Sequence, residues 1–139
     1  MTTSHTDLSN LDIIQETISK VSETHGTAEE KIYQRLFSLH PEFLPLFDLD
    51  VDGGVRKNML LTSTNCILGV AEGKKTTAHS LIQAARMIHD GYGIDDAQID
   101  SMFVAMRDTY RDILGTKWTN EMENTWSALL LDLRQVGYI

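Results

Sequence analysis

Apolar residues recur along the chain at the spacing of an α-helix rather than that of a β-strand. The spacing is clearest in two runs, Leu8, Leu11, Ile14, Ile18 and Val21, then Ile99, Met102, Phe103, Met106, Tyr110, Ile113 and Leu114. Steps of three and four residues place such side chains on one face of a helix, where they can pack against a core. No strand-like alternation of apolar and polar residues accompanies them. The pattern predicts an all-α protein.

Further segments bring the expected total to about seven helical pieces around one core. We predict helices over residues 28–39, 41–47, 54–71 and 77–89, and a last helix that runs from Met122 to Val136. Three residue pairs stand at the spacing of a capping box and mark helix starts: Ser9 with Asp12, Thr27 with Glu30, and Asp95 with Gln98. Residues 1–139 are expected to form a single domain, with residues 1–8 as a flexible N-terminal extension.

Composition and charge narrow the class of partner. The chain has 139 residues, of which 42% are hydrophobic, and its 12 basic and 20 acidic residues give a net charge of -8. That sign is wrong for a protein that binds nucleic acid or an anionic membrane through charge alone. Cys66 is the single cysteine, and no apolar run is long enough to span a membrane. We therefore expect a cytoplasmic protein whose partner is a small molecule or another protein.

One acidic loop resembles the first half of a calcium-binding loop. Asp48, Asp50 and Asp52 alternate with apolar residues before Gly53. The position of the bidentate glutamate that closes such a loop is Met59, and a thioether does not replace a carboxylate on a hard cation. An acidic, glycine-bearing surface loop is the favoured interpretation, with calcium binding as the alternative.

Other common chemical motifs are absent from the sequence. The five histidines show no HExxH spacing, and neither a GxSxG nucleophile elbow nor a GxxxxGK[ST] phosphate loop occurs. His89 stands apart because it ends a predicted helix just before the turn Gly91-Tyr92-Gly93. An imidazole at that place can project between helices toward a cofactor metal, although a histidine bonded to a carbonyl is the commoner case.

Two segments resemble a known family. Residues 32–37, IYQRLF, with His40-Pro41-Glu42 and Pro45-Leu46-Phe47, look like the second and third helices of a bacterial globin. Residues 86–94, RMIHDGYGI, look like the haem-ligating turn of the same family. The likeness is to single-domain bacterial haemoglobins and to the globin module of flavohaemoglobins, and it extends from about Leu11 to Val136, with Trp126 also fitting. It implies a globin fold around haem b.

The resemblance also implies roles for individual residues. His89 matches the proximal histidine, the axial ligand of the haem iron. Phe47 matches the aromatic residue that packs on the haem face, and Tyr33 matches the distal tyrosine, whose hydroxyl can donate a hydrogen bond to bound dioxygen. An ordinary place in the core is the alternative for Phe47, and a hydroxyl directed to solvent is the alternative for Tyr33.

The distal helix departs from the family pattern, because residues 54–61 contain no Gln or His to touch a bound ligand. Helical periodicity directs Met59, Leu60, Ser63, Cys66 and Ile67 inward, which puts Val55 at the distal position and Met59 over the iron. Ungapped spacing from Phe47 and His89 selects Lys57 and Leu61 instead. We favour the periodic register because it buries fewer polar groups. In either register ligand stabilisation depends mainly on Tyr33.

The remaining pocket assignments come from the resemblance alone. The side chains expected to complete the haem pocket are apolar: Phe37, Ile94, Met102 and Leu130. Arg86 faces either a haem propionate or solvent. Ile99 stands where related globins carry a tyrosine that makes the proximal histidine more electron-donating. This departure favours gas binding over oxygen activation.

Three functions follow from these observations. The first is reversible binding of O₂, NO or CO by a haem protein for transport, buffering or sensing. The second is a nitric oxide dioxygenase or peroxidase-like enzyme supplied with electrons by an external reductase. The third is a haem-free helical interaction module. The sequence leaves the choice between monomer and homodimer open.

Overall fold

The structure is a computed structural model that describes residues 9–74, 79 and 96–136. Its elements in chain order are α1 (Asn10–His25), α2 (Glu29–Leu39), the 3₁₀ helix η2 (Pro41–Phe47), α3 (Gly54–Ala71), α5 (Asp96–Leu114), η3 (Gly115–Lys117) and α6 (Asn120–Val136). No strand occurs in these ranges, so the predicted all-α class is confirmed for the described part of the chain. The segment that carries most of the predicted 77–89 helix lies outside the described residues, as do residues 1–8.

The predicted helix starts meet different outcomes. Ser9 caps α1, since its hydroxyl accepts a hydrogen bond from the backbone N–H of Asp12 at 3.1 Å. The prediction that Thr27 caps the next helix is wrong. Ala28 occupies the N-cap position with a left-handed backbone, φ 57°, and no side chain caps α2. The backbone N–H of Ala28 closes a tight turn onto the carbonyl of His25, which leaves Thr27 outside the helix. Asp95 lies outside the described residues.

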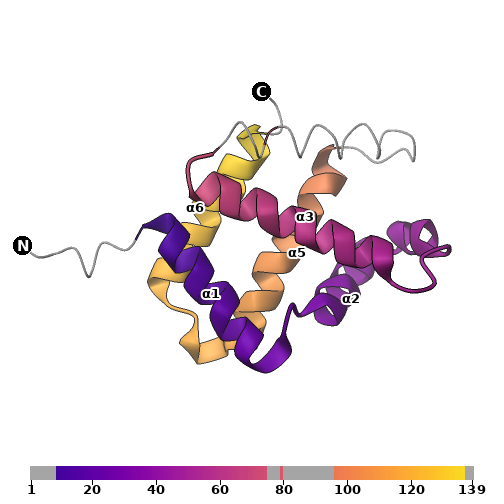
Figure 1. The fold of residues 1–139 in the computed structure, drawn as a ribbon, viewed down its shortest axis with the longest axis horizontal. Coiled ribbons are helices and arrows are strands. Elements are labelled where there is room, and N and C mark those ends of the chain that lie inside the picture. The colour runs from indigo at the N-terminus through magenta and orange to yellow at the C-terminus, as the bar shows by residue number, and fades with distance from the viewer. Residues whose placement is uncertain (1–8, 75–78, 80–95, 137–139) are drawn as a thin grey trace, which may run out of the picture.

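The long helices pack as crossed pairs (Figure 1). α1 contacts α3, α5 and α6, and α3 also lies across α6. α2 packs on α5 and on η2, which follows it directly in the chain. This arrangement places the end of η2 beside the beginning of α3, at the edge of the molecule away from α6 (Figure 1).

One buried cluster joins the helices. Its largest fully buried side chains are Trp126, Ile14, Ile32, Ile67, Met106 and Leu133. Trp126 is tied to the opposite side of the core, because its indole N–H donates to the hydroxyl of Thr17 at 3.1 Å. That hydroxyl in turn donates to the carbonyl of Ile13 at 2.8 Å. The one polar atom of the indole is thus satisfied inside an apolar core.

Short turns set the angle between α5 and α6. Gly115, with φ 52°, starts η3, and Thr119 then caps α6 by accepting from the backbone N–H of Met122 at 3.1 Å.

Within the described residues, no helix is both long and apolar enough to cross a membrane.

Candidate functional site

Three aromatic rings that the sequence nominates for one pocket touch one another. Tyr33 and Phe37 lie one turn apart on α2, with ring centroids 5.7 Å apart. Phe47, the last residue of η2, lies 5.8 Å from Tyr33 and 5.4 Å from Phe37, edge-on to both rings. Tyr33 is buried, whereas Phe37 and Phe47 are only partly covered. The rings of Phe37 and Phe47 therefore keep apolar surface that another apolar group can cover.

The hydroxyl of Tyr33 bridges α2 and the first turn of α3. It donates a hydrogen bond to the main-chain carbonyl oxygen of Arg56 at 2.8 Å. Burial raises the pKa of this phenol well above its usual range, and the nearby carboxylate of Glu29 raises it further. Tyr33 is therefore protonated at neutral pH and acts as a hydrogen-bond donor there.

The carboxylate of Asp50 fixes the backbone that Tyr33 contacts. One oxygen accepts from the N–H of Val55 at 2.9 Å, and the other accepts from the N–H of Arg56 at 3.1 Å and from its Nε at 3.0 Å. These bonds satisfy the first free N–H groups of α3, although Gly53 is its formal N-cap residue. Burial opposes ionisation of Asp50, but the bonds from Val55 and Arg56 outweigh it and lower the pKa of the carboxyl.

The same geometry bears on the calcium-like loop. Both oxygens of Asp50 are already committed to α3, and one oxygen of Asp52 accepts from the N–H of Gly54 at 2.9 Å. Among the described residues, no three His, Cys, Asp or Glu side chains lie close enough to hold a metal ion together. The apolar residues of this loop project outward, with Leu49 95% and Val51 92% exposed. The loop thus combines an inward structural carboxylate with an apolar outer tip.

α3 is apolar on more than one side. Leu60, Cys66 and Ile67 of the predicted inward stripe are buried, on a helix that packs against α1 and α6. Each proposed distal register contains one exposed apolar residue, Val55 at 53% and Leu61 at 60%. Met59 is partly buried and Lys57 is exposed. Both registers therefore stay predictions.

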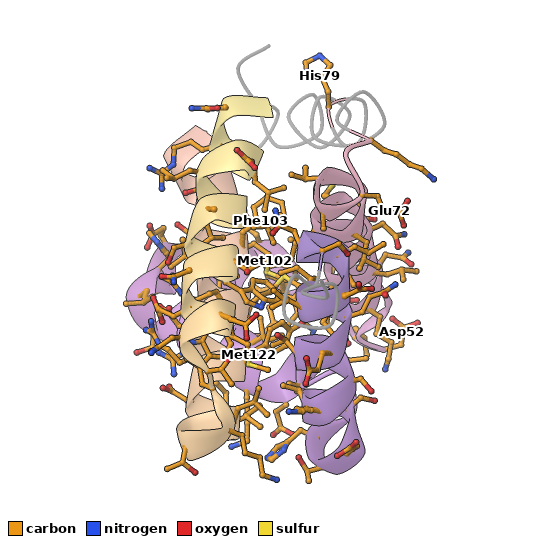
Figure 2. All side chains as sticks on the ribbon, turned by 90° about the vertical axis from the view of Figure 1, so that its left-hand side faces the viewer. Asp52, Glu72, His79, Met102, Phe103 and Met122 are labelled. Carbon is orange, nitrogen blue, oxygen red and sulfur yellow. The ribbon has the colours of Figure 1, made fainter. Side chains whose placement is uncertain are left out.

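The other predicted pocket residues divide into two groups. Met102 on α5 and Leu130 on α6 are buried in the central cluster, and Figure 2 shows Met102 among the side chains that fill the space between the helices. His89, Ile94 and Arg86 lie outside the described residues. The structure thus gathers Tyr33, Phe37 and Phe47 beside α3 and does not describe the predicted iron ligand.

Two polar features escaped the reasoning from sequence. Asp50 was placed only in a surface loop, although a carboxylate a few residues before a glycine-initiated helix is itself a capping signal. The ring of His40 stacks on Phe43, with centroids 4.8 Å apart, and its Nε2 lies 2.9 Å from the hydroxyl of Ser101 on α5. No local pattern could reveal that contact, since the two residues are far apart in the chain.

Comparisons with known proteins identify no relative. Neither the protein-family models nor the curated proteins nor the solved structures contain a match to this chain.

Proposed function

We propose that this chain is a globin-like haem protein that reversibly binds a diatomic gas, O₂, NO or CO. The observation that carries the proposal is the contact among Tyr33, Phe37 and Phe47 beside the first turn of α3. The resemblance assigns these residues to one haem pocket, and nothing in their sequence spacing alone requires all three rings to meet. An all-helical fold with this order of elements further supports it.

The described side chains suit a flat, largely apolar cofactor. Phe37, Phe47 and Met59 are partly exposed. Apolar groups left uncovered on neighbouring elements gain free energy when a planar ring system covers them. A buried phenol at the edge of the same region supplies one directed polar group, which is the usual pattern of a ligand pocket. These residues therefore fit haem b as the prosthetic group.

Haem, when bound, would supply an iron atom that can bind a diatomic gas reversibly. The protein's own residues have separate tasks in this proposal. His89 would hold the iron, Phe47 would pack on the macrocycle and exclude water, and Tyr33 would donate a hydrogen bond into the pocket. Because a phenol of raised pKa keeps its proton, Tyr33 remains a donor at neutral pH, and a bound gas would compete with the carbonyl of Arg56 for that proton.

Haemin titration of the purified protein tests the proposal. We expect saturable uptake with an intense Soret band, reduced and CO-bound spectra typical of histidine ligation, and loss or shift of that band in His89→Ala. His79→Ala serves as the matched control, because it removes another histidine from the same predicted helix. Absence of saturable uptake, or a spectrum that His89→Ala leaves unchanged, would overturn the proposed function or its ligand.

A haem-free helical interaction module is the second candidate, and the exposed tip of Leu49 and Val51 favours it. These two apolar side chains, 95% and 92% exposed at the tip of one loop, are available for contact with a partner. The haemin titration separates the two candidates, since an interaction module takes up no stoichiometric haem.

A further inference from the structure

A cavity lies beside α2, and none of the three rings of the aromatic cluster lines it. It has a volume of about 620 Å³ and lies between α2 and α5, next to the last residue of α1. Four α2 residues line it, Lys31, Gln34, Arg35 and Ser38. At 100° per residue Lys31, Arg35 and Ser38 lie about 100° or more around the helix from Tyr33 and Phe37. The volume falls in the range of small-molecule pockets, roughly 300–1,000 Å³.

The charge of this cavity is opposite to that of the protein. The whole chain carries a net charge of -8, yet Lys31 and Arg35 line the cavity against a single carboxylate, that of Asp112. His25 adds an imidazole at the rim. The negative net charge of the protein repels small anions from most of its surface. The positive side chains that line this cavity attract them locally.

The two cations differ in how they are held. The guanidinium of Arg35 is positioned from α5, because its Nε donates to the hydroxyl of Thr109 at 3.2 Å and another of its nitrogens pairs with the carboxylate of Asp112. Lys31 is exposed and forms no ion pair with any residue in the described part of the chain. One fixed donor and one adaptable donor can therefore approach the same anionic group.

Apolar surface completes the cavity. Leu39 at the end of α2 is 59% exposed although it lines the hollow, and Ile113 on α5 lines it as well. A ligand that had only charge would leave these side chains uncovered. We propose that this cavity binds a small organic anion, with its carboxylate or phosphate group at Lys31 and Arg35 and its apolar body against Leu39 and Ile113.

Replacement of Asp112 should change the affinity in the opposite direction to replacement of Lys31 or Arg35. Its carboxylate competes with the anion for the guanidinium of Arg35 and repels a negative ligand. Replacing it by asparagine should tighten binding by about two- to fivefold, which corresponds to release of an exposed ion pair. Removal of a cation should weaken binding by roughly tenfold, since each charge-assisted hydrogen bond is stronger than a neutral one.

Titration of the full chain with naphthalene-2-carboxylate, followed by calorimetry and by amide NMR shifts, tests the site. We expect saturable binding with shifts on α2 and α5, about tenfold weaker for Lys31→Gln and Arg35→Gln and tighter for Asp112→Asn. Lys117→Gln is the matched control, because Lys117 is an exposed lysine on η3 that does not line the cavity. Inorganic phosphate should compete with the probe.

Three outcomes would overturn the inference. They are equal affinity for the neutral analogue 2-naphthalenemethanol, shifts that map away from α2 and α5, and an affinity unaffected by Lys31→Gln. Lys31 is exposed, so its variant folds even if Arg35→Gln loosens the contact between α2 and α5. The result does not depend on haem, so it stands or falls separately from the proposed gas binding.

Discussion

Tyr33 donates its hydroxyl proton to the main-chain carbonyl of Arg56, a residue 23 positions later in the chain, across a distance of 2.8 Å. A phenol has one proton to donate. The proton that links α2 to α3 in this structure is therefore the same proton that the proposed function assigns to a bound gas. A gas in the pocket must compete with Arg56 or draw the hydroxyl away from it.

Tyr33→Phe removes this donor and keeps the ring. We expect a loss of unfolding free energy of about 1 kcal/mol, the net value of one hydrogen bond. In haem-loaded protein we expect O₂ to dissociate faster by roughly tenfold, because the stabilising donor is missing. Urea unfolding and stopped-flow ligand exchange measure the two effects.

Tyr110→Phe is the control for Tyr33→Phe. Tyr110 is also a buried tyrosine, and burial raises its pKa to about 12, but its ring packs on Trp126 in the core. Its variant should leave O₂ dissociation unchanged. Equal dissociation rates for Tyr33→Phe and the parent protein would show that Tyr33 does not contact the gas.

Asp50→Asn tests the carboxylate that caps α3. The pKa of Asp50 in the folded state is lowered, so this group stabilises the fold above its unfolded-state pKa of about 4 and loses that contribution as pH falls through the folded value. The variant should have a lower free energy of unfolding than the parent protein near pH 7. Its free energy of unfolding should also fall less steeply as the pH is lowered. Urea unfolding between about pH 3 and pH 7 gives both quantities.

Asp52→Asn provides the comparison for Asp50→Asn, since Asp52 is exposed and its carboxylate accepts a hydrogen bond from the backbone N–H of Gly54. Its acid limb should follow that of the parent protein. Parallel acid limbs for the parent and for Asp50→Asn would mean that the carboxylate of Asp50 contributes nothing through its charge.

Periodicity in the sequence was sufficient for most helices because their buried apolar residues recur at helical spacing, although α3 also exposes Val55 and Leu61. The predicted pieces at 28–39, 41–47 and 54–71 correspond to α2, η2 and α3 within a residue or so at each end. The capping residue of α2 was assigned wrongly because Thr27 has the right chemistry for a cap, while the backbone turn at Ala28 decides where the helix begins. Capping motifs report side-chain options and not the path of the chain into the helix.

The candidate site was less predictable, because its decisive contacts join distant segments. Tyr33 and Phe47 were nominated through a resemblance, but the partner of the Tyr33 hydroxyl is a backbone carbonyl, which carries no residue-specific signal. The register of α3 stayed open for a related reason. Val55 and Leu61 are both apolar and both exposed, so neither spacing nor burial selects the side that a cofactor would cover.

Calcium should not stabilise this protein. Both carboxylate oxygens of Asp50 are bonded to α3, and coordination of a cation would have to break those bonds. Thermal unfolding in about 1 mM Ca²⁺, the range of weak extracellular sites, should therefore give the same midpoint as in chelator. A saturable rise in the midpoint that Asp48→Asn abolishes would contradict this reading of the loop.

Thr17→Val should expose the cost of an unsatisfied indole in the core. Thr17 is buried, and its hydroxyl both accepts from Trp126 and donates to Ile13, so valine of similar shape leaves the Trp126 N–H without a partner. We expect a loss of about 1–3 kcal/mol of unfolding free energy, the desolvation penalty of a buried polar group.

Thr64→Val is the control, because Thr64 is only partly buried and its hydroxyl donates to the carbonyl of Leu60, in the preceding turn of its own helix. That variant should change stability by no more than about 0.5 kcal/mol. Equal losses for the two variants would mean that the contact between α1 and α6 at Thr17 and Trp126 does not stabilise the core beyond ordinary packing.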